Sequence, residues 1–198
     1  FGSSGIAIAE GSNTQENSSI TYDESLNEVF CCYESSLSTE TDIYCNKIQL
    51  SNQSVNEAIE ISSDSGNQEN PHTFWSGGSY LITWEDARNN SDSDIDIYFQ
   101  EYLEDSFVFS GGGYPLCTFA LKQERPIISQ YNASSFIIIW EDYRSTGKEF
   151  CANLYGQSYS SGSSECPSLG DLNGDGVYNV LDIVGLANCV LASTCDDL

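Results

Sequence analysis

The chain has 198 residues and carries 30 acidic against 6 basic side chains, which gives a formal net charge of -24. A surface this acidic repels nucleic acid and anionic membranes, so neither is expected as a partner. Aromatic residues make up 12% of the chain, which supports a folded, β-rich core rather than a disordered acidic tail. No apolar run approaches the roughly 20 residues needed to cross a bilayer, so we expect no transmembrane segment.

Three stretches of the chain repeat one pattern, which predicts three similar β-hairpins. Residues 80–100 read YLITWEDARNNSDSDIDIYFQ, residues 136–157 read FIIIWEDYRSTGKEFCANLYGQ, and residues 29–46 form a more divergent copy. Alternating, β-branched segments around a polar turn favour two antiparallel strands. A Gln-Glu pair precedes each hairpin, at residues 15–16, 68–69 and 123–124.

The length of the repeat predicts the fold class. Each unit has room for about four short strands within roughly 53 to 56 residues, the size of a propeller blade. We therefore predict a mostly β chain in which residues 1–160 form three repeated four-stranded antiparallel modules, at about 1–50, 51–106 and 107–160. Residues 158–165 predict a flexible Ser/Gly linker, and residues 166–198 a separate small C-terminal calcium loop-helix.

The Trp-Glu-Asp-x-Arg and Asp-Ile-Tyr-x-Gln pattern resembles repeats of secreted bacterial proteins with β-propeller folds. This resemblance implies a fold and says little about activity. We expect the repeated residues to anchor the core and to tie each hairpin tip through an ion pair: Trp84, Asp86, Arg88, Trp140, Asp142 and Arg144. Adjacent carboxylates such as Glu85 and Asp86 point to opposite faces of a strand, so we do not expect them to share a substrate atom.

Residues 171–182 have the spacing of a calcium loop. The ligands predicted at loop positions 1, 3, 5, 7, 9 and 12 are Asp171, Asn173, Asp175, the carbonyl of Val177, Asn179 and Asp182. Apolar residues at helical spacing follow over 180–191. The loop, with Asp at position 12, resembles half of a dockerin repeat. The resemblance implies Ca²⁺ as a stabilising cofactor, and either a cohesin-like partner or self-association.

Cysteines and glycosylation sequons together favour a secreted protein in an oxidising compartment. The sequons begin at Asn17, Asn52, Asn89 and Asn132, and the cysteines are Cys31, Cys32, Cys45, Cys117, Cys151, Cys166, Cys189 and Cys195. Cys31 and Cys32 face opposite sides of one strand, so only one of them can reach Cys45. We also predict a Cys117–Cys151 bridge and a local bridge in the tail.

The sequence shows no catalytic constellation, so we predict that the chain is not an enzyme and has no catalytic residues. His72 is the only histidine, and no phosphate-binding glycine loop is present. Three modules leave two open sheet edges, which favours a calcium-stabilised structural or adhesive protein that self-associates, in an extracellular assembly or fibre. The alternatives are a partner- or carbohydrate-binding module of the cohesin–dockerin type, and a fragment of a propeller glycosidase using two distant carboxylates.

Overall fold

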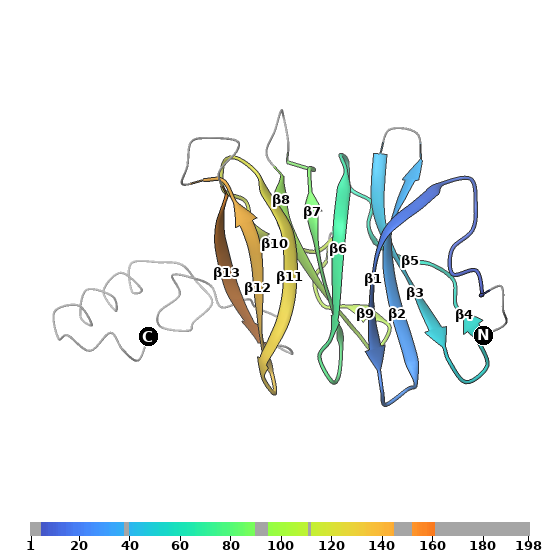
Figure 1. Ribbon diagram of the computed structural model, residues 1–198. Coiled ribbons are helices and arrows are strands. Elements are labelled where there is room, and N and C mark those ends of the chain that lie inside the picture. Colours follow the sequence, from blue (N-terminus) through green and yellow to red (C-terminus); the bar gives the residue numbers. More distant parts are fainter. Residues whose placement is uncertain (1–4, 38–39, 90–94, 111, 145–151, 161–198) are drawn as a thin grey trace. The chain divides into compact units, whose positions relative to one another are not determined.

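The computed structural model describes residues 5–37, 40–89, 95–110, 112–144 and 152–160. Within these ranges the regular structure is β-strand, arranged as three antiparallel sheets (Figure 1). The first sheet contains β1 (Thr14–Asp23), β2 (Glu28–Leu37), β3 (Glu40–Gln49), β4 (Ser54–Val55) and β5 (Ile59–Ser62). The second contains β6 (Gln68–Trp75), β7 (Tyr80–Asp86), β8 (Asp96–Leu103), β9 (Ser106–Phe107) and β10 (Tyr114–Cys117). The third contains β11 (Gln123–Asn132), β12 (Ser135–Asp142) and β13 (Asn153–Ser160).

The prediction of a mostly β chain with three antiparallel modules is confirmed for the described residues, but the predicted four strands per module are not found, because the three sheets have five, five and three strands. The hairpin of residues 80–100 is formed by β7 and β8, with Trp84 opposite Tyr98. The same hairpin recurs as β12 and β13, with Trp140 opposite Tyr155. The predicted C-terminal loop-helix lies outside the described residues. In the part of the chain that the structure describes, no helix could span a membrane.

The sheets group the strands differently from the predicted modules. β5 and β10 each pair with the third strand of the sheet before them, although the repeat assigned each to the module that follows. A repeat period gives the distance between equivalent strands, but it does not decide which strands share a sheet. β13 also continues through Ser160, so residues 158–160 of the predicted linker belong to a strand, and Tyr159 is buried.

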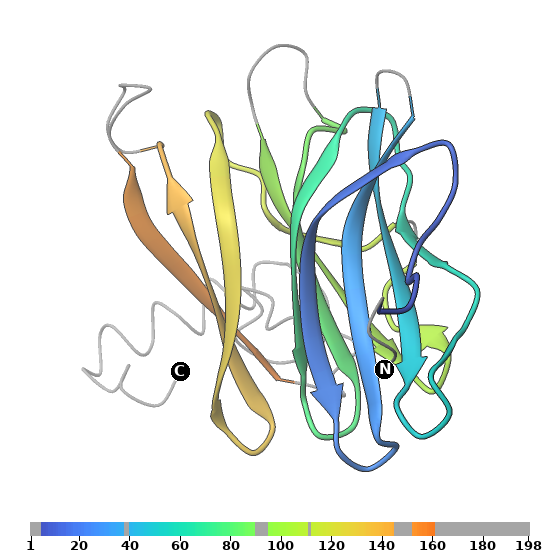
Figure 2. The ribbon, with the colours of Figure 1, turned by 45° about the vertical axis from the view of Figure 1, so that its right-hand side comes forward.

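The three sheets stack face to face, with β1, β6 and β11 as neighbouring edge strands (Figure 1, Figure 2). β6 lies against β1 of the first sheet and against β11 of the third. The second sheet is therefore covered on both faces, and every residue of β7 is buried. In β12, by contrast, buried residues alternate with half-buried ones.

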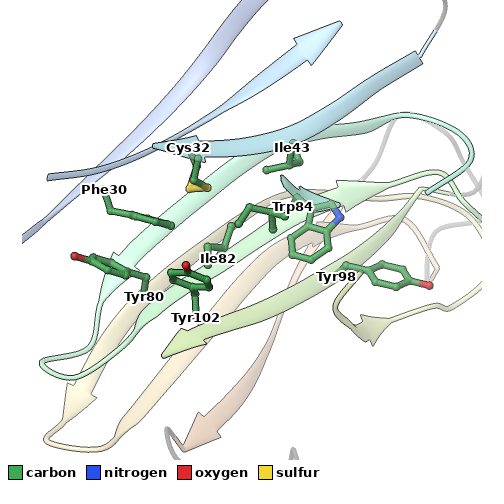
Figure 3. Packing of buried hydrophobic residues seen from close by; sticks show 10 residues of the cluster. Phe30, Cys32, Ile43, Tyr80, Ile82, Trp84, Tyr98 and Tyr102 are labelled. Atoms are coloured by element: carbon green, nitrogen blue, oxygen red, sulfur yellow. A yellow bond between two sulfur atoms is a disulfide. The ribbon is translucent and has the colours of Figure 1, made fainter. Parts of the chain in front are cut away.

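A cluster of apolar side chains fills the space between the first and second sheets (Figure 3). Its buried members are Phe30, Cys32, Ile43, Cys45, Ile61, Tyr80, Ile82, Trp84, Tyr98 and Tyr102. The ring of Phe30 stacks on that of Tyr80 with centroids 4.2 Å apart. Each fully buried large side chain contributes roughly 1.5–3 kcal/mol to stability, so this cluster is a principal part of the core.

Aromatic contacts also join the second sheet to the third. The rings of Phe99 and Tyr159 lie 4.6 Å apart, and those of Phe74 and Phe136 lie 5.8 Å apart. The hydroxyl of Tyr159 donates a hydrogen bond to Glu101, which is itself buried. The last strand of the third sheet is therefore fixed against the second sheet by both packing and polar contacts.

One disulfide lies within the first sheet. Cys32 and Cys45 are opposite one another on β2 and β3 and form a disulfide, which confirms that one cysteine of the 31–32 pair bonds Cys45. Cys31 points to the other face, where burial raises the pKa of its thiol. Cys117 is a second buried free thiol. Its predicted partner Cys151, like the tail cysteines, lies outside the described residues.

Candidate carboxylate site

The edge strand at the start of each sheet carries a glutamate next to a β-bulge. In β1, β6 and β11 the register shifts directly after Glu16, Glu69 and Glu124 respectively. The residue that follows each glutamate has a left-handed backbone, with φ of 49° at Asn17, 52° at Asn70 and 56° at Arg125. Bulges re-aim side chains at the ends of strands. The repeat therefore presents one glutamate at the same place in every sheet.

In the second and third sheets, the glutamine before the glutamate fixes the turn that leads into the strand. Gln68 is fully buried, and its amide nitrogen donates to the carbonyls of Asp64 and Gly66, at 3.1 and 3.0 Å. Gln123 makes the same two bonds to the carbonyls of Phe119 and Leu121. These bonds hold the backbone on the N-terminal side of Glu69 and Glu124 in one conformation.

Each of these glutamates lies opposite a second glutamate on the neighbouring strand. Glu16 is opposite Glu34, Glu69 is opposite Glu85, and Glu124 is opposite Glu141. Directly opposed residues share a face of the sheet, with Cβ atoms about 4.5–5.5 Å apart. Glu85 and Asp86 are adjacent in the sequence, whereas the opposed pairs are not apparent there because their members come from different strands.

The environment of the second pair favours the protonated form of its carboxyl groups. Burial, and then the charges of Glu34 and Glu16, raise the pKa of Glu69 against the effect of a hydrogen bond from Asn67. Burial likewise raises the pKa of Glu85, opposed by hydrogen bonds from the Arg125 backbone and the Asn70 side chain and assisted by the charge of Glu124. Since these charges belong to all three sheets, the carboxylates form one electrostatic cluster.

Two of the glutamates join neighbouring sheets. The backbone N–H of Asn70 in the second sheet donates to Glu34 of the first, at 2.6 Å. The backbone N–H of Arg125 in the third sheet donates to Glu85 of the second, at 2.7 Å. Glu34 and Glu85 are only 4% and 5% exposed, so each stabilises a seam between sheets, whereas Glu69 is half-buried.

The lone histidine also lies at a seam. The Nδ1 atom of His72 accepts a hydrogen bond from the backbone of Ile128, at 3.3 Å. Burial lowers the pKa of the imidazole, so its neutral form is favoured. His72 therefore links β6 to β11 as an uncharged acceptor.

The repeated Asp and Arg residues of the second sheet form a clamp at the hairpin tip. Asp86 accepts hydrogen bonds from the indole of Trp84, at 2.7 Å, and from the backbone and side chain of Arg88. The guanidinium of Arg88 also forms an ion pair with Asp64, at 2.6 Å, and lies over the ring of Tyr98. These contacts are internal to the protein and leave Asp86 fully buried.

The third sheet repeats this clamp with the same geometry. Asp142 accepts from the indole of Trp140, at 2.9 Å, and from the backbone and side chain of Arg144. Burial would raise the pKa of the Asp142 carboxyl, but the bonds from Arg144 and Trp140 outweigh it and lower the pKa. Arg144 also lies over the rings of Phe119 and Tyr155.

The predicted glycosylation sites lie on the surface, whereas the predicted calcium loop is not part of the described structure. All four sequon asparagines are exposed: Asn17, Asn52, Asn89 and Asn132. The calcium-loop residues 171–182 lie outside the described residues. Among those that the structure does describe, no cluster of three or more His, Cys, Asp or Glu side chains has a metal-binding arrangement.

Comparison with solved structures identifies the fold. The chain resembles an exo-1,5-α-L-arabinanase from a bovine ruminal metagenomic library, at 10% identity and a TM-score of 0.51, over 77% of this chain and 56% of that one. It is also similar to a GH93 α-L-arabinofuranosidase of Fusarium graminearum, at 13% identity and a TM-score of 0.47, over 70% of this chain and 42% of that one. No protein-family model and no curated protein matches the sequence.

The similarity to the arabinanase supports a propeller-type β fold. The chain spans about half the length of the solved structures that it matches. The prediction that the chain is not an enzyme is contradicted, because the solved structures that it resembles are glycoside hydrolases. That prediction relied on the lack of a contiguous catalytic motif. A site whose carboxylates come from separate strands has no such motif in the sequence.

Proposed function

We propose that this chain is part of a propeller glycoside hydrolase, and that Glu69 belongs to its active site. The observation that carries the proposal is the opposed pair of Glu69 and Glu85, in which burial and neighbouring charge raise both pKa values. The propeller-type fold supports the proposal. Arabinan, the substrate type named for the solved structures, is the polysaccharide class that we assign to it.

The two carboxylates required for glycoside hydrolysis have distinct roles. One must be protonated to donate to the leaving oxygen, and the other must be ionised. Glu69 suits the proton donor because its raised pKa retains the proton at a higher pH. Glu16, on the neighbouring edge strand and exposed, is the candidate for the ionised group. Glu85, held by the backbone of Arg125, acts as a positioning residue.

The proposal is tested by incubating the chain with linear α-1,5-arabinan and measuring released oligosaccharides by chromatography. We expect release that Glu69→Gln lowers by roughly 100-fold or more, the usual contribution of general acid catalysis. The matched control is Glu57→Gln, an exposed glutamate outside the cluster, which should retain activity. The proposal would be contradicted if the unsubstituted chain neither hydrolysed arabinan nor bound arabino-oligosaccharides.

An extracellular location is part of the same proposal. The Cys32–Cys45 disulfide supports an oxidising compartment, where an enzyme acting on polysaccharide would meet its substrate. We also propose that residues 171–182 bind calcium; an unchanged melting temperature after chelation would exclude it. The hydrolase proposal replaces the fibre-subunit hypothesis, which no comparison supports.

A further inference from the structure

One face of the third sheet is largely apolar and only partly buried. Ile127 is opposite Ile139, and Glu141 is opposite Leu154. Ile137, Ile139 and Glu141 are alternate residues of β12, so all five side chains share one face of the sheet. Ile127 is 53% exposed and Leu154 is 76% exposed. The other face, which carries Phe136 and Trp140, is buried against the second sheet. In the described part of the chain no further sheet covers the exposed face.

The equivalent face of the second sheet is buried. Ile97 lies opposite Glu85, as Leu154 lies opposite Glu141, yet Ile97 is 0% exposed. Leu81, which corresponds to Ile137, is also 0% exposed. β11 of the third sheet lies against β7 and β8 and supplies the cover. The exposed face of the third sheet therefore has the character of a surface that receives another sheet.

A specific polar contact accompanies each of the two sheet junctions. Glu34 accepts the bulge N–H of Asn70, and Glu85 accepts the bulge N–H of Arg125. Glu141 is the next member of this series. In the structure it forms an ion pair with the exposed guanidinium of Arg125, at 3.1 Å. A surface ion pair of this kind contributes little to stability, so replacing it with a buried hydrogen bond from a backbone N–H loses little free energy.

A second copy of this chain is a poor occupant of this face. To continue the stack of sheets, its first sheet would dock through the side that carries Cys31 and Tyr33, and that side is already covered by Ile6, Ile8 and Ala9 of the same chain. Each copy also carries a formal charge of -24, which opposes self-association. The occupant therefore needs an uncovered surface of its own.

We infer that the face formed by Ile127, Ile137, Ile139 and Leu154 docks a further sheet of the same repeat, and that Glu141 binds that sheet's bulge. The occupant begins with a Gln-Glu-Asn or Gln-Glu-Arg strand whose left-handed residue donates its backbone N–H to Glu141. This inference deepens the proposed function by naming the partner of the three sheets. It rests on the two observed junctions, and its test uses no glycan, so either proposal can fail alone.

The test uses the full chain and an extended chain in which residues 103–160 are duplicated directly after Ser160. Hydrogen–deuterium exchange is measured over the β12 peptide of the original repeat, residues 135–142, which segmental isotope labelling distinguishes from the identical peptide of the copy. We expect exchange in the extended chain to be slower by about tenfold or more, because the new sheet covers this face. Glu141→Gln should lower the melting temperature of the extended chain by roughly 3–6 °C and that of the original chain by less than about 1 °C.

Two controls make the outcome decisive even if the extended chain folds poorly. Glu85→Gln should lower the melting temperature of both chains, because that junction exists in each. Because Ile139 is half-buried beside Ile127, Ile139→Lys should lower the melting temperature of the original chain by less than about 3 °C. A much larger loss in the original chain would overturn the proposal by showing that the face is already covered. Unchanged exchange in a folded extended chain, or a dimer of the original chain that Ile139→Lys dissolves, would overturn it equally.

Discussion

The second and third sheets carry the same motif and the same hydrogen-bonded clamp, yet they differ in burial. Asp86 and Asp142 each accept bonds from a tryptophan indole and from an arginine two residues onward. The strand that carries the first clamp is buried along its whole length, whereas the strand that carries the second alternates. The clamp is therefore a local consequence of sequence, while burial of the glutamate face depends on a neighbouring sheet.

The largest difference should come from truncating equivalent apolar residues in these two sheets. Leu81→Ala creates a cavity between two sheets and should lower the free energy of unfolding by about 2–5 kcal/mol. Ile137→Ala, at the corresponding half-buried position, should cost less than about 1 kcal/mol. Urea denaturation of both variants measures this difference. Equal costs would mean that the third sheet is covered as fully as the second.

The clamps should respond alike. Asp86→Ala and Asp142→Ala each remove the partner of a largely buried arginine and should cost about 2–4 kcal/mol. Because the folded-state pKa of Asp142 lies below its ordinary 3.8, its contribution is complete above that pH and is lost as the pH falls through the folded value. Asp142→Asn should therefore flatten the loss of stability at acid pH. Thermal melts between pH 2 and pH 7 test this, and a large cost in one sheet alone would contradict a local clamp.

The smallest effect concerns the carboxylate cluster and has the opposite sign. The folded-state pKa of Glu69 lies above its ordinary 4.5, so the folded chain loses stability as the pH rises from 4.5 towards the folded value, and the full loss remains above it. Glu69→Gln should therefore raise the melting temperature at pH 7 by about 1–3 °C and have less effect at pH 4. A site residue that limits stability fits a catalytic role. Destabilisation by Glu69→Gln at pH 7 would instead indicate a structural role.

Much of the architecture could be predicted from the sequence because the repeats encode it locally. Alternating apolar residues indicated the hairpin strands. Because consecutive residues of a strand point to opposite faces, only one of Cys31 and Cys32 could reach Cys45. The grouping of strands could not be predicted, because β5 and β10 have the same sequence spacing whichever sheet they join. In the structure β5 pairs with β3 and β10 pairs with β8.

The candidate site was missed for a related physical reason. Glu69 and Glu85 are separated in sequence and meet only through the register of β6 against β7. The signal was present in the recurring Gln-Glu pairs, each followed by a Trp-Glu or Tyr-Glu pair. To use it, one must know that a bulge lies between Glu69 and His72 and sets which residues are opposed.

The most direct test of the central claim is to map where an arabino-oligosaccharide binds. Hydrogen–deuterium exchange of the chain with and without arabinopentaose would report on the starts of β1, β6 and β11. We expect slower exchange in the peptides that contain Glu16, Glu69 and Glu124. Exchange in the Asp86 and Asp142 clamps should be unchanged. Protection confined to other surfaces, or no protection at saturating oligosaccharide, would contradict it.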